Sequence, residues 1–110
     1  MSDVKNLVHE RVLDDLVQRI VQTAQPERIV LFGSAARGEM KADSDLDVLV
    51  IKSGDYHRGK LTERIYMALR GLGAAVDVIV AKPEDIDRYG ESSALVFSAA
   101  LREGKVLYVA

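Results

Sequence analysis

The sequence predicts a single α/β (α+β) domain in which a small mixed β-sheet is flanked by helices. An amphipathic pattern with helical spacing opens the chain, short apolar runs typical of buried strands follow it, and a second helical pattern separates two of those runs. The chain has 110 residues, of which 48% are hydrophobic and 29% charged. Because these values are those of one ordinary globular domain, residues 1–110 are expected to form one unit.

The first predicted element is a long helix over residues 4–24. Its apolar residues recur at spacings of three and four, and charged residues fall between them. Ser2 or Asp3 can cap its start, and Pro26 lies just beyond its end, where proline cannot continue a helix. Such a helix could dock a partner protein, but packing of its apolar face on the domain's own sheet is the favoured interpretation.

Three strands are predicted in the middle of the chain, over residues 28–32, 46–51 and 75–81. Because 11 residues connect the first two strands, fewer than a parallel crossover needs, these strands are expected to be antiparallel neighbours. A helix over about residues 58–72, ended by Gly71 and Gly73, joins the second strand to the third. That connection is long enough for a parallel pair, so the sheet is expected to be mixed.

The last part of the chain is expected to hold short elements. Pro83 favours the start of a short helix that ends near Gly90, and a further helix is expected over residues 92–101. Residues 106–109 are expected to form a final edge strand.

Charge and composition indicate which classes of binding partner and which cellular compartment are expected. With 15 basic and 17 acidic residues, the chain lacks the positive charge of a typical nucleic-acid binder, so no direct nucleic-acid partner is expected. The absence of cysteine excludes disulfides and thiolate metal sites and fits a reducing compartment. There is no apolar signal region and no run of the ~20 apolar residues that span a bilayer. A cytoplasmic protein without membrane association is expected.

Two carboxylates open the second predicted strand. Asp45 and Asp47 are two positions apart, so their side chains are expected on one face of the strand, roughly 6–7 Å apart along the backbone. Magnesium prefers oxygen ligands and is usually held by one or two carboxylates together with substrate phosphates. The pair therefore predicts a metal site that a phosphate-bearing substrate completes.

A third carboxylate interrupts the third predicted strand. Asp77 lies between Val76 and Val78 in an apolar run, where an unpaired buried carboxylate would be costly. We therefore expect Asp77 to be buried and to have a partner, which a metal held by Asp45 and Asp47 would supply if the two strands are adjacent.

Small residues follow the first strand at Gly33 and Ser34. Glycine permits a close backbone approach, and the N–H groups of a short helical turn favour phosphate, to which the serine hydroxyl adds a donor. Arg37 could add positive charge, but pairing with Glu39 or Asp43 to brace the loop is equally reasonable, so Arg37 is not assigned to catalysis.

Two other phosphate-binding motifs are excluded because the chain lacks residues that they require. Gly33 and Gly38 have Walker A spacing, but Glu39 and Met40 stand where that motif needs Lys and Ser or Thr. The glycines of residues 71–73 follow a helix and lack the third glycine of a Rossmann motif.

The two histidines and Tyr56 are weaker candidates for site residues. His9 and His57 give no zinc constellation and are expected at the surface. Tyr56 could stack on a base, but an ordinary packing or surface role is favoured.

The central motif resembles the minimal nucleotidyltransferase (MNT) domains of the DNA polymerase β-like superfamily. Its signature is a Gly-Ser pair, ten intervening residues and an Asp-Leu-Asp triplet, formed here by Gly33, Ser34, Asp45, Leu46 and Asp47. Asp77 matches the place of that family's third carboxylate. Residues 99–108 also resemble the closing segment of MNT proteins encoded beside HEPN-domain ribonucleases.

The resemblance implies a nucleotidyltransferase fold, two Mg²⁺ ions and ATP as the nucleotidyl donor. It assigns catalytic metal binding to Asp45, Asp47 and Asp77, and places Gly33 and Ser34 against the departing phosphates. For the subgroup it implies an antitoxin that restrains a HEPN toxin by transferring AMP to one of its tyrosines, by binding it, or by both.

Two alternative functions remain open. One is nucleotidyl transfer to a small hydroxylated molecule such as an aminoglycoside, although such enzymes usually carry a second domain that holds the acceptor. The other is a non-catalytic module that neutralises its partner stoichiometrically. Retention of three carboxylates argues against the second.

Overall fold

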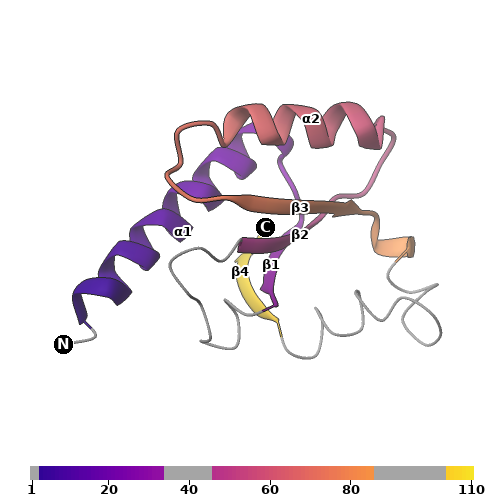
Figure 1. Ribbon diagram of the computed structural model, residues 1–110. Coiled ribbons are helices and arrows are strands. Elements are labelled where there is room, and N and C mark those ends of the chain that lie inside the picture. The colour runs from indigo at the N-terminus through magenta and orange to yellow at the C-terminus, as the bar shows by residue number, and fades with distance from the viewer. Residues whose placement is uncertain (1–2, 34–45, 86–103) are drawn as a thin grey trace.

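The structure is a computed structural model and describes residues 3–33, 46–85 and 104–110 (Figure 1). Its elements in chain order are α1 (Asp3–Ala24), β1 (Arg28–Phe32), β2 (Leu46–Ile51), α2 (Arg58–Ala68), β3 (Val76–Ala81) and β4 (Lys105–Val109). Residues 83–85 are also helical, as Pro83 predicted. The expected end at Gly90 and the expected helix over residues 92–101 lie outside the described residues. Within the described ranges, no helix has the length and apolar content to cross a membrane.

The four strands form one mixed sheet in the order β3-β2-β1-β4. The pair β1–β2 is antiparallel, and so is β1–β4, whereas β2 and β3 are parallel. The short β1–β2 connection and the helical β2–β3 crossover predicted these two directions correctly. The predicted edge position of the last strand is also confirmed, since within the part of the chain that the structure describes β4 pairs with β1 alone.

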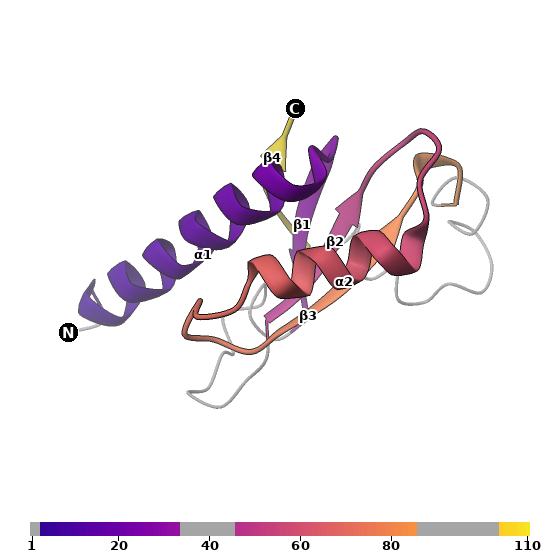
Figure 2. The same cartoon turned by 90° about the horizontal axis from the view of Figure 1, so that it is seen from above.

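Both helices cover the same face of the sheet, as the view in Figure 2 shows. Leu16 and Ile20 of α1 and Ile65 of α2 are fully buried there. They pack with alternate strand residues, including Val48 and Val50 of β2. The expected packing of the first helix on the domain's own sheet is therefore confirmed.

The opposite face of the sheet carries a smaller apolar cluster. It is formed by the buried residues Val30, Leu49, Ile51 and Ala81, with Phe32 and Ile79 partly buried against them. Since side chains alternate along a strand, Asp47 shares this face with Leu49, and Asp77 shares it with Ile79. The two aspartates thus lie on the face that α1 and α2 do not cover.

The second helix is shorter than predicted. It ends at Ala68, and the N–H of Leu69 donates to the carbonyls of Ile65 (3.0 Å) and Tyr66 (3.2 Å), which tightens the last turn. The expected stop at Gly71 lies further along, where the chain adopts a positive φ of 78°. The apolar spacing extended the predicted helix to Leu72. This residue is apolar because it is buried, but it lies beyond the end of the helix.

One arginine joins α1 to the end of α2. Arg19 donates from Nη1 to the carbonyl oxygens of Ala68 (3.2 Å) and Arg70 (2.6 Å), and its Nε lies 3.0 Å from Asp15 Oδ1. These are carbonyls at the C-terminal end of α2, which a guanidinium can satisfy.

Candidate active site

Asp47 and Asp77 occupy matching positions on neighbouring strands. The parallel register of β2 and β3 pairs Asp47 with Asp77, and the antiparallel register of β1 and β2 pairs Asp47 with Phe32. Neighbouring strands lie about 4.8 Å apart, and paired residues point to the same face of the sheet. The structure therefore brings these two predicted site residues together.

The expected burial of Asp77 is wrong. Asp77 is exposed, whereas Asp47 is half-buried. The apolar neighbours Val76 and Val78 belong to the helix side of the sheet, and alternation turns Asp77 to the other side. Among the described residues β3 is an edge strand, so none of their strands lies along one flank of Asp77. Because Asp77 is exposed, it does not need a partner to compensate for burial. Its position beside Asp47 is therefore the observation that links it to the site.

Gly33 lies directly against the carboxylate of Asp47. Gly33 has a positive φ of 73°, and a Cβ built on it would clash with Asp47 Oδ2 and lie 3.3 Å from Asp47 Cγ. Only glycine adopts this backbone conformation readily and leaves the space that the carboxylate occupies. The close approach expected at Gly33 is thus made to a side chain of the site, and its contact with phosphate stays a prediction.

The remaining predicted site residues, Asp45 and Ser34, lie outside the described residues, as does Arg37. The three-carboxylate cluster therefore stays a prediction. Among the residues that the structure describes, no three His, Cys, Asp or Glu side chains gather where they could hold a metal ion.

The described part of the site fits a hard cation. Asp47 and Asp77 both offer carboxylate oxygens on one face of the sheet, the donor type that Mg²⁺ prefers. Asp77 is accessible, so a bound ion could retain water and substrate oxygens as further ligands.

Tyr66 is a residue near the site that the sequence did not indicate. Its hydroxyl oxygen accepts a hydrogen bond of 2.8 Å from the N–H of Val78, the amide that directly follows Asp77. This bond ties α2 to the edge strand β3. No sequence pattern could have revealed it, because it depends on how α2 packs across β3.

His57 and Tyr56 lie just after β2, at the end of that strand opposite Asp47. His57 is exposed and caps α2, with its Nδ1 accepting from the N–H of Lys60 at 3.1 Å. Tyr56 donates its hydroxyl to the carbonyl of Lys52 at 2.7 Å, and burial is the main cause that raises its pKa. The expected surface position of His57 and packing role of Tyr56 are confirmed.

Comparison with known proteins identifies the family. The profile of the family described as "Nucleotidyltransferase domain" matches residues 10–100. MJ0604 of Methanocaldococcus jannaschii, a candidate protein adenylyltransferase, is 32% identical over 82 residues, which are 74% of this chain and 78% of that protein. The chain belongs to the nucleotidyltransferase domain family and is a nucleotidyltransferase.

Solved structures with the same fold include antitoxins. A toxin–antitoxin structure with AMP-PNP has a TM-score of 0.62 and 20% identity, covering 89% of this chain and 73% of that one. The complex of a tri-AMPylated Shewanella oneidensis HEPN toxin with its MNT antitoxin gives a TM-score of 0.55 and 17% identity, covering 92% and 72%. These likenesses establish the nucleotidyltransferase fold that the central motif implied.

Proposed function

We propose that this chain is a magnesium-dependent antitoxin that transfers AMP from ATP to a tyrosine of a HEPN ribonuclease toxin. The observation that carries the proposal is the pairing of Asp47 with Asp77 across β2 and β3, with Gly33 against Asp47. The relatives add support, since one is a candidate protein adenylyltransferase and another is bound to an AMPylated HEPN toxin.

The site residues take separate roles in the proposed reaction. Asp45, Asp47 and Asp77 would hold two magnesium ions, which supply Lewis-acid stabilisation of the charge that develops on phosphate oxygens. Gly33 and Ser34 would face the phosphates that depart. Asp77, as the exposed member of the described pair, is reachable by a hydroxyl that another protein presents.

The proposed transfer is an in-line displacement at the α-phosphorus of ATP. The tyrosine oxygen of the acceptor forms a bond to the α-phosphorus, and the bond from that phosphorus to the bridging oxygen of the β-phosphate breaks. Pyrophosphate leaves with that oxygen. The proton of the tyrosine passes to the carboxylate of Asp77 and from there to solvent.

A labelling experiment tests the proposal. The purified chain is incubated with a candidate HEPN toxin, magnesium and each α-labelled nucleoside triphosphate in turn. Label is expected on the toxin from ATP alone, at a tyrosine that mass spectrometry identifies. The Asp45→Asn/Asp47→Asn variant is expected to transfer no label.

A charge-matched control uses Asp14→Asn/Asp55→Asn, which removes two exposed carboxylates outside the site and should leave the labelling intact. The proposal is lost if the wild type and Asp45→Asn/Asp47→Asn suppress the toxin equally and neither transfers label. That result would instead favour the non-catalytic binding module.

A further inference from the structure

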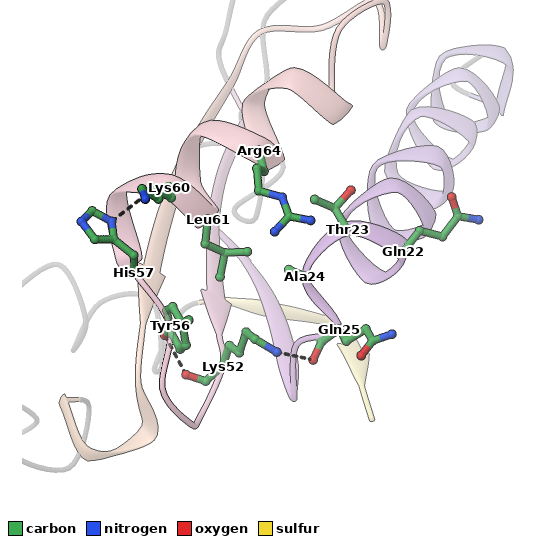
Figure 3. Close-up of a pocket in the computed structure, with 10 residues that line it drawn as sticks. All are labelled: Gln22, Thr23, Ala24, Gln25, Lys52, Tyr56, His57, Lys60, Leu61 and Arg64. Atoms are coloured by element: carbon green, nitrogen blue, oxygen red, sulfur yellow. Dashed lines mark hydrogen bonds between the residues drawn. The ribbon is translucent and has the colours of Figure 1, made fainter.

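A pocket lies on the helix side of the sheet, away from the two aspartates (Figure 3). We call it the basic pocket; its volume is about 500 Å³, and it is lined by the end of α1, the segment after β2 and the start of α2. Small-molecule sites typically measure about 300–1,000 Å³. Lys52 of the pocket follows β2, whereas Asp47 is near the start of that strand, so roughly 17 Å of extended chain separates them.

The lining of the basic pocket is positively charged. It includes Lys52, Lys60 and Arg64 and no acidic residue, although acidic residues outnumber basic ones in the whole chain. Lys60 and Arg64 are four positions apart on α2 and share one face of that helix. Figure 3 shows the guanidinium of Arg64 directed into the space between α2 and α1.

These charges are not neutralised by neighbouring carboxylates. In residues 3–33, 46–85 and 104–110, neither Lys60 nor Arg64 forms an ion pair. Two of the three acids near Tyr56 have other partners, since Glu27 accepts from the hydroxyl of Ser53, and Asp85 lies 2.6 Å from Arg58 Nη2. The third, Glu84, is exposed and does not line the pocket. An anion entering the pocket would therefore meet available cations.

The backbone contributes partial charges of both signs, because the start of α2 and the C-terminal end of α1 both line the pocket. The first turn of α2 carries no acidic residue, so the partial positive charge of that helix end is not offset locally. Lys52 closes the other side, with its Nζ 3.4 Å from the carbonyl oxygen of Gln25 at the end of α1. Cations thus approach the pocket from two directions.

Part of the wall is apolar. Leu61 and Ala24 are buried beneath the charged groups, and the ring of Tyr56 is held in place by the hydrogen bond from its hydroxyl to Lys52. Lys82 Nζ lies 5.4 Å from the centre of that ring and adds a further cation beside the pocket. The pocket therefore offers an organic group a surface next to an anion site.

We propose that the basic pocket binds the phosphate ester of a small organic molecule. Arg64 can hold two phosphate oxygens at once, Lys60 and Lys52 supply point charges, and the wall of Leu61 and Tyr56 accepts the carbon skeleton. This proposal does not depend on the acceptor of the nucleotidyltransferase reaction, because the pocket lies at the other end of β2.

Two-dimensional amide NMR of the full chain in metal-free buffer tests the proposal. Ribose 5-phosphate and AMP serve as probes, and ribose and adenosine as their uncharged counterparts. Both phosphates should shift the amide signals of residues 57–61 and of Ala24, with binding that weakens as salt is added. Because both probes contain ribose 5-phosphate, tighter binding of AMP would show that the base adds to the affinity. Ribose and adenosine should cause no such shifts.

Lys60→Gln/Arg64→Gln should weaken phosphate binding by about tenfold or more. Arg11→Gln/Arg70→Gln removes the same charge from two exposed residues outside the pocket and should change the affinity less than twofold. Equal weakening by both pairs, or adenosine binding as tightly as AMP, would overturn the proposal. So would shifts with a 5′-phosphorylated oligonucleotide alone, which would indicate a nucleic-acid surface.

Discussion

The carboxylate of Asp47 occupies the space that a side chain on Gly33 would need. Gly33 also has a φ of 73°, so alanine there introduces backbone strain of about 1–2 kcal/mol and forces the carboxylate to move. We expect Gly33→Ala to reduce nucleotidyl transfer far more than it reduces stability. Transfer is measured with α-labelled ATP, and the free energy of unfolding by urea titration.

Gly71→Ala is a control that introduces similar backbone strain but leaves the geometry of the site unchanged. Gly71 has a similar φ of 78°, and nothing lies within 4 Å of a Cβ built on it. Its substitution should cost comparable stability and leave transfer intact. If both variants lose transfer in proportion to stability, the contact between Gly33 and Asp47 has no catalytic importance.

Asp77→Asn should strongly reduce activity without unfolding the protein. Asp77 is exposed and opposes another carboxylate, Asp47, so neutralising it removes a like-charge pair. In metal-free buffer the melting temperature of Asp77→Asn should equal or exceed that of the wild type. Nucleotidyl transfer should fall by about 100-fold or more, the scale of losing one electrostatic catalytic group.

The exposed Asp55 gives a control for that prediction, since Asp55→Asn should alter neither quantity by much. Retention of full transfer by Asp77→Asn would remove Asp77 from the site. A large drop in its melting temperature would assign it a structural role instead.

Arg19→Ala should destabilise the protein more than Asp15→Ala. Arg19 donates to two carbonyls at the end of α2, and charged hydrogen bonds of this kind contribute about 1.5–3 kcal/mol. Asp15 is 45% exposed, and its one ion pair among the described residues is with Arg19, so its loss should cost about 0.2–1 kcal/mol. Urea titration of both variants measures the difference; equal costs would mean that the carbonyl contacts contribute little.

Tyr56 should make stability fall at high pH. Burial raises the pKa of Tyr56 above its ordinary value of 10.0, so the folded state favours the neutral phenol. Its contribution is fully present below pH 10 and is lost as the pH rises through the higher folded pKa. Thermal melts above pH 10 should therefore show a smaller decline for Tyr56→Phe than for the wild type. Identical declines would contradict this assignment.

The directions of the strands could be predicted from the lengths of their connections. The link after β1 is shorter than a parallel crossover needs, which favoured an antiparallel pair, and the α2 segment was long enough for a crossover. The order of the strands could not be predicted, because the position of β4 beside β1 depends on contacts between distant parts of the chain. For the same reason the edge position of β3, and with it the exposure of Asp77, was missed.

The chemistry of the site was predictable where it depends on local spacing. Gly33, Asp47 and Asp77 were all identified from the sequence, because glycine turns and strand carboxylates have clear local patterns. The contact between Gly33 and Asp47 and the bond from Val78 to Tyr66 were not, since each joins elements that only packing brings together. The basic pocket was missed for the same reason: Lys60 and Arg64 show helical spacing, but the opposite wall comes from α1.

Because of the register of β2 and β3, the core residues of β3 also determine the orientation of a site residue. Val76, Val78 and Val80 pack toward the helices, and their alternation is what turns Asp77 to the same side as Asp47. A slip of one residue would bury Asp77 among the helices and expose valines, so the apolar face opposes any such slip. Mutations that loosen the packing of these valines should therefore impair the enzyme before they unfold it.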